Sequence, residues 1–329
     1  MPSLRYNGRS LALLVPTMNR PDKMRNLLES IAGQTVVCGR IVVVDGGSSV
    51  REVVMGFADR LPVEHYICQP PGQIRQRNMG IGLLDERTPL VGCLDDDIVL
   101  LPAALEKMME CWNRCSSNTA GISFNIVNMP AEGHNWLKGL IGMSGPEPGR
   151  VLRSGRNTPI VSMATDRQVE WLCGGATVWK LEILKQHTNR EAQARWAPLE
   201  DLIFSYPIGK LHPLHVCAAA QVRHEHVYDH NIKRKHAYYG RTETLWKFYF
   251  VESHEELSRM RFLILQFSTV AARLLMALVT FDTRHLQFAL GQFQGLFLGL
   301  KSLFLGRSLF ALLNEPLPTG ETKAKRHTA

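Results

Sequence analysis

The sequence has 329 residues, 45% of them hydrophobic, and its 38 Lys and Arg against 30 Asp and Glu leave a formal net charge of +8. This length is sufficient for one large domain or two smaller ones, and the ordinary composition excludes a largely disordered chain. The basic excess suits a polyanionic partner such as nucleic acid, an anionic lipid surface or a phosphorylated substrate, without choosing among them.

Cysteine usage and the N-terminal residues bear on the cellular compartment. The seven cysteines are odd in number and include no Cys-x-x-Cys pair, which argues against a disulfide framework and favours a reducing compartment. Residues 1–10 contain no apolar run that could serve as a secretory signal. We therefore expect a chain that stays in the cytoplasm.

Short β-branched runs alternate with helix-like stretches in the first hundred residues. Strands are expected at 11–15, 41–44, 63–68 and 90–94, and helices at 21–31 and 73–84. Continuous apolar strands separated by helices predict an α/β fold with a parallel sheet covered on both faces. Ligands of such sheets bind beyond the carboxyl ends of the strands. Asp45 and the triplet of Asp95, Asp96 and Asp97 follow two of these strands, which points to a site at this edge.

The middle of the chain is less regular, and its end is helical. A glycine- and proline-rich stretch at 139–159 predicts a loop near a site, and strand-like sequence returns at 170–180 and 212–222. Long helical segments follow from about residue 235. We expect a first domain over 1–235, a helical membrane-associating region over 236–315 and a flexible basic tail over 316–329.

The helical region combines membrane-like and polar features. Between residues 262 and 281 the only charge is Arg273, and a segment of this length could span a bilayer. An arginine at the bilayer centre, however, costs about 2.5–3.5 kcal/mol on insertion scales. Polar residues also recur at every seventh position, at Arg259, Gln266, Arg273, Thr280, Gln287, Gln294 and Lys301.

Three glycines in this region allow close helix packing. Gly291, Gly295 and Gly299 form one face of a helix, on which a second helix can approach closely. We expect helices that lie in the membrane interface or pack as a shallow hairpin. A helical subdomain packed on the first domain is the alternative.

The acidic triplet is the strongest local signal. Three acids directly after a buried strand are costly to place together unless a cation neutralises them. Asp95 and Asp97, two residues apart, can both reach one hard divalent ion or its water shell. Such an ion would bridge the two phosphates of a nucleotide diphosphate. A polar turn before a helix near Pro102 is the plain alternative.

Six short segments together resemble glycosyltransferase family 2 in order and spacing. They lie at 14–20, 42–48, 72–80, 95–97, 173–176 and 199–201. The resemblance implies a GT-A-type nucleotide-binding domain with a mostly parallel central sheet, and C-terminal amphipathic helices follow it here. It also implies an inverting enzyme that uses a nucleotide-diphosphate sugar and a divalent cation, Mg²⁺ or Mn²⁺.

The resemblance implies roles for residues on the donor side. Pro16 and Thr17 would hold the nucleoside base, and Asp45 would read the base or the ribose. Arg77 and Asn78 would face the nucleotide, with Arg77 near the phosphates. A turn at Asp45 and a solvated helix face at Arg77 and Asn78 remain the plain alternatives.

Further roles concern the metal ion. The resemblance implies that Asp97 and Asp95 manage the cation, Asp97 more directly, and that Asp95 and Asp96 also contact the donor. His224, after the last predicted strand, would complete the metal site. A surface histidine on a polar loop is the alternative, and a zinc site built from the histidines around it lacks a matching cysteine set.

On the acceptor side, the resemblance implies a general base. Asp201 would deprotonate the acceptor hydroxyl, with Glu200 in support, and Gly174 and Gly175 would form a turn on the acceptor side. The alternatives are a helix start favoured by acids at its first turn and an ordinary tight turn.

Departures from the family pattern limit what carries over. Gly46 replaces the second acid of the usual Val-Asp-Asp-Gly-Ser, and the Gln-x-x-Arg-Trp element of processive members is absent after Asp201. We therefore expect the addition of one sugar per binding event.

The sequence from residue 236 to 241 resembles members of this family that build bacterial surface polysaccharides on lipid carriers. This resemblance implies a saccharide or lipid-linked acceptor and fits a place at the cytoplasmic face of the membrane. The basic residues Lys233, Arg234, Lys235 and Arg241 could meet anionic lipid there. No motif supports a nucleic-acid partner for them, and we expect none.

Other functions remain as alternatives. An apolar strand followed by Asp-x-Asp also resembles haloacid-dehalogenase-type phosphatases, in which Asp95 would be the nucleophile and Asp97 the acid. A catalytically inactive nucleotide-sugar-binding assembly subunit is a second alternative. A nicotinamide-dependent dehydrogenase is not supported, because no Gly-x-Gly-x-x-Gly follows the first strand.

Overall fold

The computed structural model describes residues 5–130, 133–191, 198–225 and 236–313. Each strand and helix expected up to residue 94 is present. They are the strands β1 (Leu11–Thr17), β2 (Arg40–Asp45), β3 (Val63–Ile67) and β4 (Leu90–Leu94), and the helices α1 (Pro21–Ala32) and α3 (Gln73–Gly82). A short 3₁₀-helix η1 (Gly8–Ser10) and helix α2 (Arg51–Met55) complete this part.

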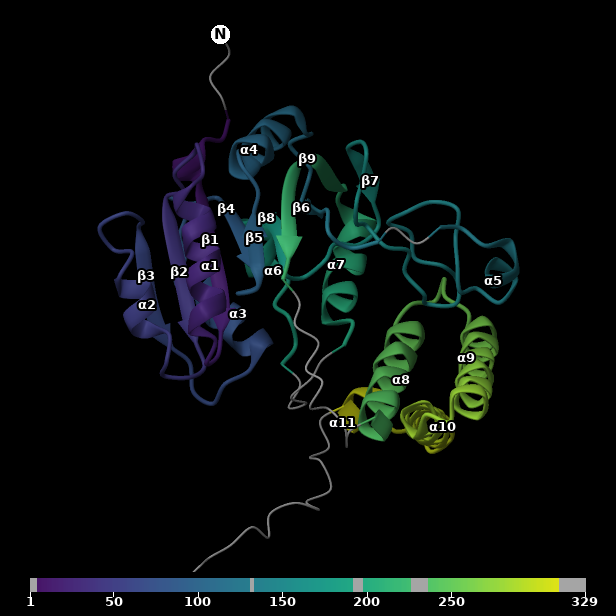
Figure 1. Ribbon diagram of the computed structural model, residues 1–329. Helices are drawn as coiled ribbons and strands as arrows, with labels where there is room; N and C mark the ends of the chain where they lie inside the picture. Colours follow the sequence, from purple (N-terminus) through teal and green to yellow (C-terminus); the bar gives the residue numbers. More distant parts are fainter. Residues whose placement is uncertain (1–4, 131–132, 192–197, 226–235, 314–329) are drawn as a thin grey trace, which may run out of the picture.

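All strands of the described chain belong to one sheet. The later strands are β5 (Ile98–Leu100), β6 (Gly121–Ile126), β7 (Arg167–Val169), β8 (Ala176–Lys180) and β9 (Leu214–His224). The order is β3-β2-β1-β4-β8-β6-β9-β5, with β7 also paired to β9. The first four strands, β6 and β9 run in one direction, whereas β5, β7 and β8 run in the other. The predicted α/β fold with a mostly parallel, GT-A-like sheet is confirmed (Figure 1).

The middle of the sheet differs from the expectation. The strand expected at 170–180 begins only at Ala176, and β6 was not expected at all. Two polar residues interrupt the apolar pattern of β6, and both are buried. The Ser123 hydroxyl donates to the carbonyl of Ala176 at 3.2 Å, and the Asn125 amide donates to the carbonyl of Ala218 at 3.0 Å. These polar groups can be buried because β8 and β9 supply their hydrogen-bond partners. No local sequence pattern shows that these strands will lie beside β6.

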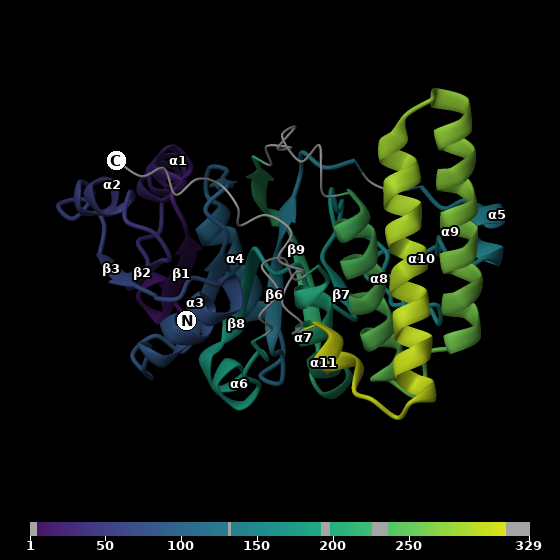
Figure 2. The ribbon, with the colours of Figure 1, turned by 90° about the horizontal axis from the view of Figure 1, so that it is seen from below.

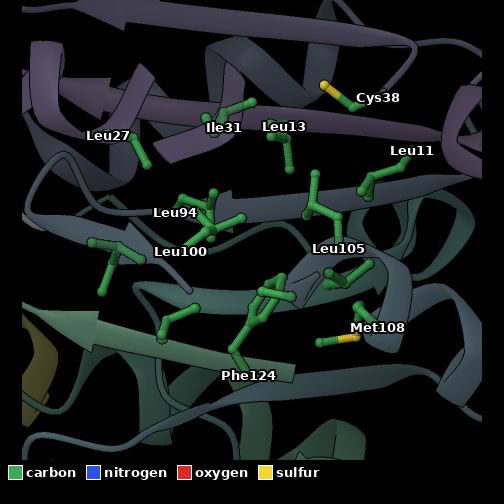
Figure 3. Close-up of a cluster of buried hydrophobic side chains, with 14 of the residues drawn as sticks. Leu11, Leu13, Leu27, Ile31, Cys38, Leu94, Leu100, Leu105, Met108 and Phe124 are labelled. Atoms are coloured by element: carbon green, nitrogen blue, oxygen red, sulfur yellow. The ribbon is translucent and has the colours of Figure 1, made fainter. Parts of the chain in front are cut away.

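Alternate residues of β1 enter two hydrophobic clusters, one on each face of the sheet. Leu13 packs in the first cluster with Met108 of α4 (Ala104–Arg114) and with Phe124 of β6 (Figure 3). Leu14 packs in the second cluster, beside α3, α6 (Leu181–Gln186) and α7 (Glu200–Leu211). Both faces of the central strands are therefore covered, which explains their unbroken apolar sequence.

The C-terminal helices pack against the second face. They are α8 (His236–Glu252), α9 (Arg259–Thr280), α10 (Thr283–Phe304) and α11 (Leu309–Leu313). Phe248 and Phe250 of α8 are buried in the same cluster as Tyr206 of α7. Figure 2 shows α8, α10 and α9 side by side at the edge of the molecule away from β3. The tail expected at 316–329 and the basic residues 233–235 lie outside the described residues.

The three glycines of α10 lie against α8, as their spacing predicted. A Cβ on Gly291 would overlap the carbonyl oxygen of Ala237, and one on Gly299 would overlap the Phe248 ring. Helices α8 and α10 can approach this closely along their length only because glycine has no Cβ. Helix α10 is therefore held to the body of the protein.

Helices α9 and α10 expose many large apolar side chains and bury two glutamines. Gln266 and Gln292 are buried, and the Arg273 guanidinium lies 3.8 Å from the centre of the Phe288 ring. Sixteen of the 25 large hydrophobic side chains that are exposed in the described chain lie between Met260 and Leu305. Among the described helices, α9 is long and apolar enough to cross a membrane, and 22% of that stretch is buried.

Candidate active site

Polar side chains gather at the carboxyl ends of the parallel strands. Thr17 and Asp45 are the last residues of β1 and β2, and Asp95 follows β4 directly. Asp97 precedes β5, which pairs with the end of β9 and so places Asp97 near His224. The fold brings these residues to one edge of the sheet, the lower edge in Figure 1.

Asp96 is the most buried member of the acidic triplet. Its Oδ2 accepts a hydrogen bond of 2.7 Å from the Thr17 hydroxyl, and its Oδ1 accepts one of 2.9 Å from the Arg20 guanidinium. Burial raises the pKa of Asp96 above its ordinary value, and these two donors oppose the rise. Asp96 therefore joins the triplet to the end of β1, and Arg20 neutralises part of its charge.

Asp97 and His224 face each other across β5 and β9. The Asp97 Oδ1 lies 3.1 Å from the His224 Nε2, and the Asp97 Oδ2 lies 3.4 Å from the Arg20 guanidinium. The hydrogen bond to Asp97 is the main cause that raises the pKa of His224. The structure thus places two of the three expected metal ligands together.

Arg77 connects the triplet to helix α7. Its guanidinium donates to the Asp95 Oδ1 at 2.8 Å and also pairs with Glu200, while Gln73 donates to the same Asp95 oxygen at 3.1 Å. Burial by itself would lower the pKa of Arg77, but the charges of Glu200 and Asp95 raise it above the ordinary value. Its buried Nε has no hydrogen-bond partner among the described residues. Arg77 is therefore a fixed positive charge between two carboxylates.

Gly174 and Gly175 separate the triplet from the first turn of α7. A Cβ on Gly175 would overlap the Asp95 carboxylate, and one on Gly174 would lie 2.8 Å from the Glu200 Oε1. The Asp95 amide also donates to the Gly175 carbonyl at 2.8 Å. Glycine is required at both positions because the carboxylates approach the backbone so closely.

Asp201 occupies the other side of this glycine turn. Its carboxylate accepts backbone hydrogen bonds from Leu202 at 2.8 Å and Gly174 at 3.4 Å. Burial, reinforced by the charge of Glu200, raises the pKa of Asp201 to about 6. Within the part of the chain that is described, Asp201 makes no ion pair, whereas Glu200 is held by Arg77 and by Asn189 at 3.1 Å. Asp201 is therefore the carboxylate better suited to accept a proton near neutral pH.

Comparison with known proteins agrees with this geometry. Residues 12–157 match the family described as Glycosyl transferase family 2. No curated protein matches the chain.

Two solved structures are similar to much of this chain. The S. aureus TarS crystal structure is 15% identical with a TM-score of 0.48, and the match covers 78% of this chain and 43% of that one. A mannosyltransferase, PcManGT from Pyrobaculum calidifontis in complex with GDP-Man and Mn²⁺, is 13% identical with a TM-score of 0.55. That match covers 90% of this chain and 89% of the mannosyltransferase and shows a shared fold.

The family 2 segment supplies only part of the site. The glycine turn, the two acids of α7 and His224 lie beyond residue 157, and the sheet and the start of α7 bring them against the segment. The family 2 match over residues 12–157 favours a glycosyltransferase over the dehalogenase-type phosphatase alternative. The Asp95 carboxylate, its proposed nucleophile, is instead held by Arg77 and Gln73.

Three predicted donor-side residues make no hydrogen bond to the acidic triplet in the described chain. Asp45 is fully buried and accepts a hydrogen bond of 2.7 Å from the Gly47 amide, while its other oxygen lies 3.3 Å from the His65 Nε2. Pro16 is buried within β1. The Asn78 amide donates to the carbonyl of Asn189 at 2.9 Å, so this side chain points toward the segment before α7.

Some site residues received no role from the sequence. Arg20, Gln73 and Gln76 lie inside the segments that carry the family resemblance, so their position was a usable signal. The Gln76 amide donates to the carbonyls of Thr17 and Val44 at 2.7 Å each and thereby ties β1 to β2. His65 and Asn189 had no such signal, because only the tertiary structure brings them to their partners.

Proposed function

We propose that this protein transfers a single sugar, with inversion, from a nucleotide-diphosphate sugar to a saccharide or lipid-linked acceptor, using Mg²⁺ or Mn²⁺. The observation that carries the proposal is the position of Asp201. Its pKa is raised to about 6, so it is mostly ionised at neutral pH, and only a glycine turn separates it from the acidic triplet of a family 2 domain. The complex of the similar mannosyltransferase with GDP-Man and Mn²⁺ supports this choice of donor and cation.

Asp97, His224 and Asp95 would hold the cation. Two carboxylates and one imidazole suit Mn²⁺ or Mg²⁺, and the Asp97–His224 pair is already assembled. A bound divalent cation supplies positive charge that stabilises the departing diphosphate. Asp95 is shared with Arg77, so the same carboxylate links the cation site to a second positive charge. Arg77 would stabilise the negative charge that develops on the diphosphate.

Asp201 would accept the proton of the acceptor hydroxyl. The acceptor oxygen then forms a bond to the anomeric carbon as the bond from that carbon to the diphosphate oxygen breaks, which inverts the configuration. Glu200 supports the step in two ways. Its charge raises the pKa of Asp201, and its ion pair holds Arg77 in place.

The direct test uses a panel of nucleotide sugars. The full chain is incubated with each sugar, with Mg²⁺, Mn²⁺ or a chelator, and release of the nucleoside diphosphate is measured. The proposal requires release or transfer that depends on the cation for at least one donor. Donor binding with no turnover in any condition would instead support the inactive binding subunit.

The proposal also includes a membrane surface at the cytoplasmic face. The outer faces of α9 and α10 carry many large apolar side chains, while Gln266 and Gln292 are buried and the Arg273 guanidinium lies against the Phe288 ring. This arrangement suits an apolar surrounding better than water. Because Gly291 and Gly299 hold α10 against α8, the helix pair would lie along the bilayer surface and not leave the body to span it. Arg261 and Arg307 are exposed near the helix ends, where they could meet anionic headgroups.

A further inference from the structure

A cluster of thiols lies apart from the candidate active site. Cys111 is on α4, Cys115 caps the end of that helix, and Cys217 is near the start of β9. Cys217 precedes His224 by seven residues on the same strand, which corresponds to roughly 20 Å. The cluster is therefore near the end of β9 opposite to the one that carries the candidate active site.

The ligand atoms of this cluster are already close together. The sulfur atoms of Cys111 and Cys217 and a carboxylate oxygen of Asp166 all lie within 4.8 Å of one another. The Cys115 sulfur lies 4.0 Å from that of Cys111. Two thiolates on one tetrahedral zinc ion are about 3.8 Å apart, because each Zn–S bond is about 2.3 Å. Small side-chain movements would therefore suffice to bind a metal.

The three thiols make weak contacts in this structure. The Cys111 and Cys115 sulfur atoms share a hydrogen bond of 4.0 Å, and the Cys217 thiol donates to the carbonyl of Lys107 at 3.6 Å. Thiolates are the form that binds metal, so metal binding would release the thiol protons. Asp166 adds a carboxylate, and Arg114, 3.2 Å from it, adds a balancing positive charge.

Asp166 is held in place by an irregularity in β9. The register between β6 and β9 shifts just after Cys217, so that Asn125 pairs with Gln221 instead of the next residue. This bulge frees the Ala218 amide, which donates to the Asp166 Oδ1 at 2.8 Å. Bulges often serve to redirect a side chain, and this one orients a carboxylate toward two buried thiols.

We infer that Cys111, Cys217 and Asp166, with Cys115 as the fourth ligand, form a binding site for a thiophilic divalent metal of the zinc class. Cys111 and Cys217 are buried, whereas Asp166 is exposed and Cys115 is half-buried, so an ion can enter from the side of these two residues. The bound ion would fasten the end of α4 to β9. The site is independent of the proposed sugar transfer.

Cobalt provides a specific probe. The reduced, chelator-treated full chain is titrated with Co²⁺, and the thiolate-to-cobalt charge-transfer absorption is recorded. We expect one Co²⁺ per chain in this band, its loss on addition of Zn²⁺, and a higher melting temperature with Zn²⁺. The ligands proposed at the candidate active site are oxygen and nitrogen atoms, so a metal held there by them gives no such band.

Variants assign the band to the cluster. Cys217→Ser is expected to abolish it, and Cys38→Ser, which changes another buried thiol, is expected to leave it unchanged. Asp166→Asn keeps an acceptor for the Ala218 amide but removes the carboxylate. Zinc affinity should then fall by more than the roughly 10–100-fold that loss of an outer-shell partner causes.

Two variants on the accessible side of the cluster keep the test decisive if Cys217→Ser does not fold. Asp166→Asn and Cys115→Ser change groups that are not fully buried, and both are then expected to weaken Co²⁺ binding. Absence of the band in the reduced wild-type chain would overturn the inference, as would a band that these variants leave unchanged. A Cys111–Cys115 or Cys111–Cys217 disulfide in a chain that takes up no metal after reduction would also overturn it.

Discussion

The sheet and the α9–α10 pair differ in the side chains that they expose to their surroundings. In the sheet, the strands are apolar and the charged residues gather at the edge, where Arg77 and Arg20 pair with four carboxylates. In the helix pair, Gln266 and Gln292 are buried while Phe281 and Phe304 are 91% and 90% exposed. The proposed function accounts for the difference: the sheet edge would meet water and a charged donor, and the outer face of the helices would meet an apolar phase.

The largest expected effect is a loss of transfer rate without a loss of donor binding at the sheet edge. Asp201→Asn should lower the transfer rate by about 10²–10⁴-fold, because the base is lost while its shape is kept. Nucleotide-sugar binding, measured by calorimetry, should change little. Asp59→Asn, on the exposed surface after α2, is the control and should keep full activity. Full activity in the Asp201→Asn variant would rule out Asp201 as the general base.

The next effect concerns the cation. Asp97→Asn should lower the metal-dependent rate by about 10²–10³-fold, the cost of losing one strong electrostatic contact to a leaving group. His224→Ala should raise the Mn²⁺ concentration required for half-maximal rate, and excess Mn²⁺ should restore part of the activity. An Asp97→Ala protein that retains full activity would contradict the proposed site.

Removing exposed aromatic rings tests the helix pair without touching the sheet edge. The double change of Phe293→Ser and Phe297→Ser alters two outward-facing residues of α10. Each ring that enters the membrane contributes about 1.5–3 kcal/mol, so binding to anionic vesicles in a sedimentation assay should fall by about 100-fold or more. Val37→Ser, at an equally exposed apolar residue of the first region, is the control and should bind vesicles like the wild type. Unchanged vesicle binding in the double variant would exclude this face.

The smallest effect is a pH shift. The raised pKa of Asp201, about 6, means that the folded protein holds this proton more tightly than a free aspartate does. The rate at saturating Mn²⁺ should therefore rise as pH increases through about 6, where Asp201 becomes ionised. Glu200→Gln removes the neighbouring negative charge and should move this rise in rate to lower pH. If the rise stays at the same pH in the variant, another group controls it.

Local patterns in the sequence determined the first half of the fold and the strand ends that carry the site. Apolar runs bounded by turn residues predicted β1 to β4, since a central strand must be apolar on both faces. The Asp95–Asp97 triplet was visible as a candidate cation site because charge after a buried strand is unfavourable without compensation. The glycine spacing of α10 likewise predicted the close contact with α8, because it depends on one helix face only.

Only the tertiary structure decided which of these residues meet. The Arg77–Glu200 pair and the Asp97–His224 pair each join residues more than a hundred positions apart, and their contact depends on strand order and register. The inward turn of Gln266 depends on how α9 packs, and Cys217 reaches Cys111 only because β9 lies beneath α4. Hydrophobic periodicity reports whether a face is buried, but it does not identify the neighbour that covers it.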